Sequence, residues 1–172
     1  MRSPPDPSVL AVNLYTTRST TEIVTGPQPT PTVETPLTPA ALRAQLLASG
    51  EATLVKAEWG KGNVAASENI SGDVVWSDDK QVGYMRLRGL PVNDKSKEQY
   101  QLWIFEDGKL EPHPKDGGVF DVNAEGEVII PIDAKLATNQ PKAFAITIEK
   151  PGGVVVSDRK RIAGLAVVKP SA

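Results

Sequence analysis

The sequence predicts an all-β protein, an antiparallel β-sandwich of the immunoglobulin-like or a similar Greek-key type, with one short helix on its N-terminal side. Eight or more short apolar stretches follow one another at close spacing, separated by turn residues, which favours antiparallel strands over βαβ units. The stretch 99–105 carries large apolar residues in both of its alternating rows, as a strand covered on both faces does. The clearest helical pattern is confined to residues 38–50.

Composition excludes several classes of function. A chain of 172 residues fits one ordinary domain with flanking segments. Its formal charge of −2 and its scattered lysines and arginines argue against a nucleic-acid partner. The absence of cysteine excludes disulfides, thiolate metal sites and cysteine nucleophiles. No run of about 18 apolar residues appears, and the N-terminus does not have the pattern of an intact signal peptide.

The N-terminal residues 1–37 are predicted to form a semi-rigid, solvated linker. They hold seven of the fifteen prolines and many threonines, so they bury too little apolar surface to offset the entropy of ordering. Within this linker, Val9–Tyr15 is apolar enough to pack as a strand or short helix against the domain or a partner. A disordered but adhesive segment is an equally good interpretation.

The helix predicted at residues 38–50 has recognisable ends. Thr38 can cap it, Pro39 suits its first turn and Gly50 ends it. Three leucines, at positions 42, 46 and 47, form a narrow apolar stripe. A helix of about three turns is marginal alone, so the stripe should dock either on its own sheet or on another chain.

Strands are predicted from residue 53 onwards, where the apolar period changes to two. The predicted strands cover residues 53–59, 64–70, 72–77, 82–90, 99–105, 117–122, 127–132 and 143–149, with 154–157 returning as a partner strand and 165–168 closing the sheet. The dipeptide Asp107-Gly108 predicts a tight turn after 99–105. Leu90-Pro91 ends its strand because proline cannot donate to a ladder. Residues 51–172 together form the predicted sandwich domain.

No catalytic or metal-binding constellation can be assembled from the residues. The single histidine, His113, lies between two prolines and is predicted to be an exposed loop residue, so neither a copper or zinc site nor a serine triad is available. The acid pairs Asp78 with Asp79 and Asp116 with Asp121 lack the regular spacing of a calcium loop and are interpreted as solvated turn residues. We therefore predict no enzyme, no cofactor and no metal.

Three further groups of residues allow both a structural and a functional interpretation. Glu149 ends a core strand and is predicted to pair locally, although a desolvated carboxylate there would be a functional candidate. The glycine pairs 117–118 and 152–153 are predicted to serve turns and bulges, since neither opens a helix as a phosphate-binding loop does. Trp59, Trp76 and Trp103 are predicted to be packing residues, and the alternative is an exposed platform for sugar or peptide.

Several motifs, in their order and spacing, resemble the C-terminal domain of the anti-sigma-K factor (RskA) family. They are Gly72-Asp73-Val74-Val75-Trp76, Gly89-Leu90-Pro91, Tyr100-Gln101-Leu102-Trp103, Gly117-Gly118-Val119-Phe120 and Thr147-Ile148-Glu149-Lys150-Pro151-Gly152-Gly153. The resemblance covers roughly residues 70–157 and brings no catalytic residue with it. It marks as structural positions Trp76, Leu90, Pro91, Tyr100, Leu102, Trp103, Gly117, Phe120, Glu149, Gly152 and Gly153.

The resemblance implies a bacterial membrane regulator. In that family a cytoplasmic helical domain holds an extracytoplasmic-function sigma factor inactive, one helix crosses the membrane, the domain similar to this chain lies outside, and regulated proteolysis releases the sigma factor. This chain would then be the extracytoplasmic sensor or scaffold domain, with residues 1–37 as the juxtamembrane linker, where a protease or signalling protein acts. Sigma-factor binding would belong to a cytoplasmic part absent from this chain.

The alternative function is an extracellular β-sandwich module that binds carbohydrate or peptide through an aromatic sheet face. Solvent exposure of the three tryptophans distinguishes the two functions. An enzyme comes third and would require a deep pocket with converging Asp or Glu residues.

Overall fold

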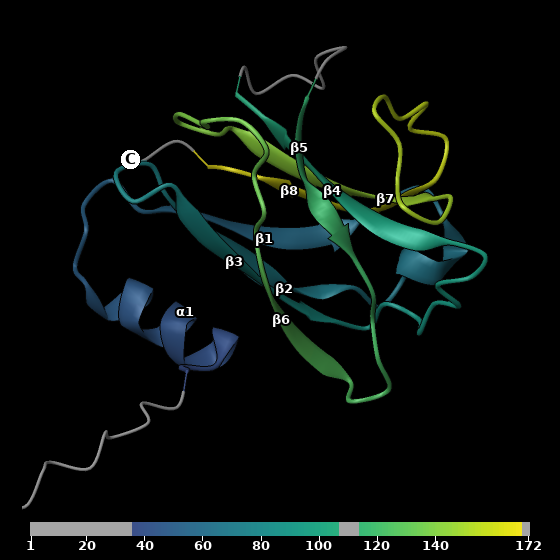
Figure 1. The fold of residues 1–172 in the computed structure, drawn as a ribbon, viewed down its shortest axis with the longest axis horizontal. Coiled ribbons are helices and arrows are strands. Elements are labelled where there is room, and N and C mark those ends of the chain that lie inside the picture. Colours follow the sequence, from purple (N-terminus) through teal and green to yellow (C-terminus); the bar gives the residue numbers. More distant parts are fainter. Residues whose placement is uncertain (1–35, 107–113, 170–172) are drawn as a thin grey trace, which may run out of the picture. The chain divides into compact units, whose positions relative to one another are not determined.

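The computed structural model describes residues 36–106 and 114–169, which form one helix, one 3₁₀ turn and eight strands (Figure 1). The elements are α1 (Pro39–Ala48), β1 (Val55–Lys61), η1 (Ala65–Ser67), β2 (Ser71–Ser77), β3 (Val82–Arg88), β4 (Gln99–Phe105), β5 (Lys115–Phe120), β6 (Glu127–Pro131), β7 (Ala143–Glu149) and β8 (Ile162–Val167). The predictions for residues 1–35, for His113 and for the turn at Asp107-Gly108 lie outside the described residues.

The strands form one antiparallel sheet in the order β5-β4-β7-β8-β1-β2-β3-β6. After β6 the chain turns back to the opposite edge of this sheet. There the Asp133 N–H donates to the Gly117 carbonyl and the Lys135 N–H donates to the Asp116 carbonyl, each at 3.0 Å. β6 and β5 are the two edge strands of the sheet. The segment that follows β6 is bonded to β5, so the sheet is nearly closed, like a barrel.

Mostly antiparallel β structure with one short helix is therefore confirmed. The finer prediction was a sandwich, in which two separate sheets pack face to face. The strand pairing instead describes a single curled sheet, with β1 paired to β2 on one edge and to β8 on the other.

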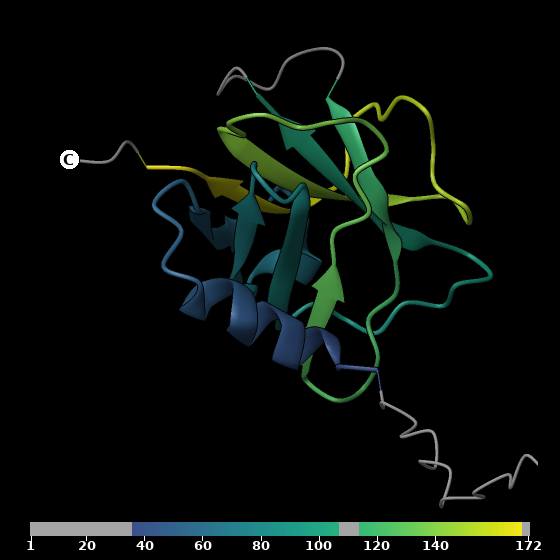
Figure 2. The same cartoon turned by 60° about the vertical axis from the view of Figure 1, so that its left-hand side comes forward.

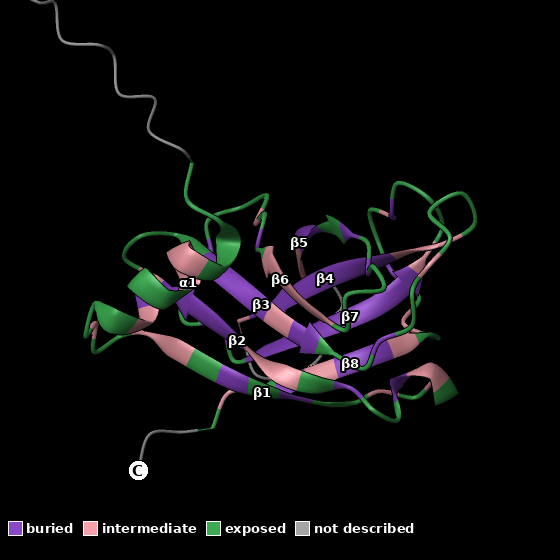
Figure 3. Ribbon diagram, turned by 90° about the horizontal axis from the view of Figure 1, so that it is seen from below, coloured by how far each residue is buried: buried purple, intermediate pink, exposed green. Residues whose placement is uncertain are grey.

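The main core fills the inside of this curled sheet, and the alternation in the strands predicts it well. In β4, Tyr100, Leu102 and Ile104 belong to the interior cluster, whereas Trp103 and Phe105 pack on the outer face. The outer contacts come from Ala143, Ala145, Val154 and Leu165. Thus β4 is covered on both faces, as its sequence predicts, and it is buried along nearly its whole length (Figure 3).

Helix α1 packs on the outer face of β2, β3 and β6 (Figure 2). The Thr38 side chain accepts a hydrogen bond from the Ala41 N–H at 3.2 Å and caps the helix, while Gly50 follows its end with a φ of 66°. Leu46 is buried against Val75 and Tyr84. The leucine stripe therefore docks on the chain's own sheet.

Two predicted strands are wrong. Residues 64–70 do not extend, because the Ser67 hydroxyl donates to the Val64 carbonyl at 2.7 Å and accepts from the Gly62 N–H at 3.1 Å, which stabilises the turn η1. Residues 154–157 form no strand, because the side-chain amide of Gln101 takes the place of a partner strand. Gln101 accepts from the Val154 N–H at 2.9 Å and donates to the Val154 carbonyl at 3.0 Å.

Candidate functional site

The acidic residues considered for metal or acid–base chemistry accept hydrogen bonds that stabilise turns and, for Asp116, the strand β5. Asp78 accepts from the Trp76 indole N–H at 2.9 Å and from the Gln140 backbone N–H at 2.8 Å. Asp116 accepts from the Gly118 N–H at 2.8 Å, and Asp121 accepts from the Gln99 and Asn93 side chains. Over residues 36–106 and 114–169, no group of three or more His, Asp or Glu is placed to hold a metal ion.

All three tryptophans are buried. Trp59, Trp76 and Trp103 expose 6%, 0% and 1% of their surface. The indole N–H of Trp103 donates to the Thr147 hydroxyl at 2.8 Å, so its polar end is also enclosed. An aromatic platform for sugar or peptide, which needs exposed rings, is therefore not present on these side chains.

Several of the predicted marker residues meet at the start of β4. The Tyr100 hydroxyl donates to the Pro91 carbonyl at 2.9 Å, and its ring stacks on Phe120 with the centroids 5.7 Å apart. Burial raises the pKa of Tyr100 to about 12; the charge of Glu98 adds to this rise, and that of Arg161 opposes it. The phenol therefore stays protonated and keeps its donor role near neutral pH.

Two marker glycines lie where a side chain has no room. A Cβ on Gly117 would come within 2.6 Å of Leu102, and one on Gly153 would come within 2.6 Å of Val119 and 2.7 Å of the Gln101 amide oxygen. Gly153 also has a φ of 74°, which disfavours other residues. Trp76 and Leu90 are buried in the interior cluster, Gly152 donates its N–H to Gln99, and Glu149 accepts from the Ser157 hydroxyl. These contacts are packing and turn contacts.

Helix α1 carries a polar attachment beside its apolar one. The Asp73 carboxylate on β2 receives two guanidinium groups, those of Arg43 on α1 and Arg86 on β3, the latter at 2.8 Å. The Arg43 side chain is only 11% exposed, so this ion pair is partly shielded from water. The chain that enters the domain is thus held at its first element by both a buried leucine and a shared carboxylate.

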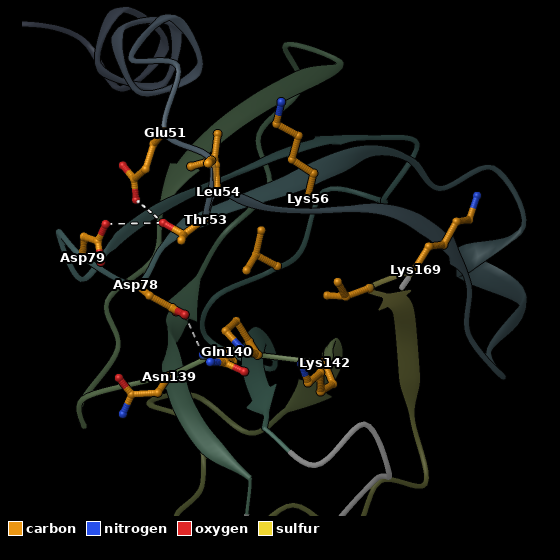
Figure 4. Close-up of a pocket in the computed structure, with 14 residues that line it drawn as sticks. Glu51, Thr53, Leu54, Lys56, Asp78, Asp79, Asn139, Gln140, Lys142 and Lys169 are labelled. Atoms are coloured by element: carbon orange, nitrogen blue, oxygen red, sulfur yellow. Dashed lines mark hydrogen bonds between the residues drawn. The ribbon is translucent and has the colours of Figure 1, made fainter. Parts of the chain in front are cut away.

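An open groove of about 950 Å³ lies where the first half of β1 separates from the end of β8 (Figure 4). Its walls come from residues 51–56, 78–79, 139–142 and 168–169. Thr53 donates to Glu51 and Asp79, and the Lys80 ammonium and Ser77 hydroxyl donate to Glu51. The hydrogen bond from Lys80, followed by that from Ser77, lowers the pKa of Glu51.

The basic side of the groove is different. Lys56, Lys142 and Lys169 are exposed, and their ammonium groups make no ion pair or hydrogen bond within the described part of the chain. Sequence reasoning did not find this groove. Its residues are spread from position 51 to position 169, and only the pairing register of β1 and β8 brings them together.

None of the described helices is long and apolar enough to cross a membrane. A model of the C-terminal domain of the anti-sigma-K factor RskA matches residues 8–158. Neither the curated proteins nor the solved structures contain a significant match to the chain.

Proposed function

The chain belongs to the family of the anti-sigma-K factor RskA C-terminal domain, and on this premise we propose that it is the extracytoplasmic sensor and scaffold domain of a transmembrane anti-sigma factor. Membership in this family supports a regulatory role and not a catalytic one. The observation that carries the proposal is the family match over residues 8–158, which includes the whole of the sheet up to β7 and the loop after it.

In the proposed arrangement, residues 1–37 connect the domain to a membrane-spanning helix that is not part of this chain. The domain keeps a protease or signalling protein from acting on this linker until a signal or partner changes the arrangement. A cytoplasmic part, also outside this chain, binds the sigma factor. The marker residues around β4 serve in this proposal to keep the domain folded, in agreement with their packing and turn contacts.

Helix α1 is the element through which such a linker is joined to the sheet. It begins at Pro39, after the capping residue Thr38, and is attached to the sheet by Leu46 and by the Arg43–Asp73 ion pair. Release of α1 would lengthen the accessible chain by the helix itself. We therefore propose that docking of α1 sets where accessible linker ends and protected domain begins.

The test uses the full-length protein in cells, with cleavage followed by immunoblot and sigma-factor activity followed by a transcriptional reporter. One variant replaces residues 1–37 with a Gly/Ser chain of half the length, and another carries Leu46→Asp to release α1. Leu136→Asp, at a leucine that is 63% exposed, is the matched control. We expect both test variants to change cleavage and reporter output while the control does not. Unchanged regulation in both test variants would overturn the proposed mechanism.

Placement outside the cytoplasm has a separate test. A reporter enzyme that is active only after export is fused to the C-terminus of the full-length protein, with a cytoplasm-active reporter at the same position as the comparison. The proposal expects activity from the export-dependent reporter alone. Activity from the cytoplasmic reporter alone would place the domain inside the cell and overturn the assignment.

A further inference from the structure

Among the residues that the structure describes, the first half of β1 has a strand partner on one edge only. Residues 55–58 pair with β2, but pairing with β8 begins only at Trp59, opposite Ala166. Along a strand the N–H and C=O groups of alternate residues point to opposite sides. Every second residue of this half therefore directs its backbone donor and acceptor away from β2, towards the groove.

The reason for the separation can be read from the side chains. If the β1–β8 ladder continued in its register, Lys56 would lie opposite Lys169, and Val55 would lie opposite Pro170. Like charges directly opposite each other destabilise a sheet, and proline has no N–H to donate to a ladder. The paired part of the seam ends at Trp59 and Ala166, and both obstacles lie within the part that is open.

The opening exposes two different surfaces. Val55 and Val168 are partly buried and pack against the interior cluster, so the inner side of the opening is apolar. Their chain neighbours, Lys56 and Lys169, point to the outer side, because successive residues of a strand alternate in direction. The groove thus combines backbone groups without a strand partner, an apolar inner side and the unpaired positive charge of Lys56 and Lys169. The acidic residues that also line it, at positions 51, 78 and 79, lie on the other side and accept hydrogen bonds from within the domain (Figure 4).

We propose that this groove binds an extended peptide of alternating apolar and acidic residues, which adds a strand to the free edge of β1. The apolar residues of the peptide would contact Val55 and Val168, and its carboxylates would lie between Lys56 and Lys169. Main-chain pairing supplies affinity in this mode of recognition, and alternate side chains supply specificity. The inference concerns this chain alone and does not depend on the proposed regulatory role.

Charge selects this occupant over a second copy of the chain. In an antiparallel pair of two β1 edges, a second copy brings Glu58 together with Lys56, whereas an acidic peptide brings negative charge alone. The groove holds Lys56, Lys142 and Lys169 without ion pairs in the described residues, so it favours the acidic peptide. Lysine on a free edge protects it from indiscriminate pairing. An acidic peptide is the partner for which the same lysines are attractive, so the charges that exclude one partner favour another.

The test uses the full 172-residue chain and a capped octapeptide that alternates glutamate with valine, with binding followed by calorimetry and by backbone NMR. We expect shifts of the amides at residues 55–58 and 167–169, and an affinity that falls as salt is added. The comparison peptides are an alternating lysine–valine peptide and the glutamate–valine peptide N-methylated at alternate residues. Both should bind at least about tenfold more weakly, the first by repulsion and the second through lost main-chain pairing.

Substitutions in the chain locate the effect. Lys56→Gln with Lys169→Gln removes the two charges and keeps most of the side-chain length, and we expect about tenfold weaker binding. Lys95→Gln with Lys150→Gln is the matched control, because these lysines are exposed, lie away from the groove and also make no side-chain ion pair in the described residues. No binding of the peptide would overturn the proposal. The proposal would also be overturned if the N-methylated peptide bound as tightly as the unmodified one, or if the control variant lost as much affinity as the Lys56 and Lys169 variant. A signal that comes only from self-association of the chain would overturn it too.

Discussion

The seam between β1 and β8 is sealed along one half and open along the other, although the two strands keep a single register. In the sealed half, Trp59 to Lys61 pair with Ala166 to Gly164, and Asn63 continues the contact by bonding Ile162 through both its backbone and its side chain. In the open half, β2 is the one strand that pairs with β1 over residues 36–106 and 114–169. Because the register is the same along the whole seam, the difference between the halves lies in the residues that face each other.

Glycine allows the sealed half to close. A Cβ on Gly62 would lie 1.9 Å from the Ile162 carbonyl oxygen, and one on Gly164 would lie 2.6 Å from the Ile70 side chain. The open half instead has Lys56 and Lys169 at the positions that a longer ladder would pair. Glycines therefore let the strands approach at one end of the seam, whereas like charges oppose their pairing at the other end.

The largest effect is expected from Gly62→Ala, which should force the sealed half apart. The new Cβ meets backbone that cannot move freely, so we expect a loss of about 2–3 kcal/mol in the free energy of unfolding, measured by chemical denaturation. Gly60→Ala is the control, since its Cβ has one ordinary contact at 3.5 Å. Equal losses in the two variants would show that close approach at Gly62 does not seal the seam.

A smaller effect is expected from Asn63→Ala. The Asn63 side-chain oxygen accepts a hydrogen bond from the Ile162 N–H at 2.8 Å, so its removal should lower the free energy of unfolding by about 1 kcal/mol. Hydrogen exchange of the Ile162 amide should become faster, while exchange in β4 should not change. Asn63→Asp keeps an acceptor at this place and should retain most of the protection. A comparable loss in both variants would argue against the hydrogen bond as the cause.

Lys56→Glu should narrow the open half. If the ladder were extended, the new glutamate would lie opposite Lys169, so a pair of like charges becomes a pair of opposite charges. The free energy of unfolding should rise by about 0.2–1 kcal/mol. Slower hydrogen exchange at residues 55–58 would report the added pairing. Lys56→Gln removes the repulsion without adding attraction and should give a smaller gain. If neither variant slows exchange, charge is not what holds the strands apart.

The smallest effect concerns pH at the open half. The pKa of Glu51 is lowered in the folded chain, first by the hydrogen bond from Lys80. Its contribution to stability is therefore complete above the ordinary glutamate pKa and is lost as the pH falls through the lowered folded value. NMR titration of the Glu51 carboxyl should show this pKa, and Lys80→Met should raise it. An unchanged pKa in that variant would contradict the role given to Lys80.

The alternation of apolar and polar residues in the sequence was sufficient to predict most strands of the sheet. It predicts the faces of β4, and it places Phe144, Ile146 and Ile148 of β7 together in the interior, as observed. The helix was equally clear, because Thr38 and Gly50 are local signals for its ends. Such features depend on neighbours in the chain, which a single sequence displays.

One failure, at residues 64–70, comes from local hydrogen bonds of Ser67 that compete with an extended chain, and the others depend on contacts between distant residues. Residues 154–157 have an apolar strand pattern, but the buried amide of Gln101, 53 positions earlier, occupies the backbone of Val154. The groove depends on the register of β1 and β8, whose continuation would set Lys56 opposite Lys169, and this register cannot be read from either stretch of sequence by itself. For the same reason the curling of the sheet, which rests on bonds from residues 133 and 135 to β5, could not be anticipated.

The place of β8 between β7 and β1 has a consequence for the order in which the chain can fold during synthesis. β1 is the first strand to leave the ribosome and β8 the last, yet each is the other's neighbour in the finished sheet. Until residue 167 has emerged, β1 can pair only with β2, and the ladder that joins the two ends of the sequence cannot form. Contacts between such distant segments slow folding because a long loop must close first. Completion of the sheet is therefore tied to the release of the whole domain.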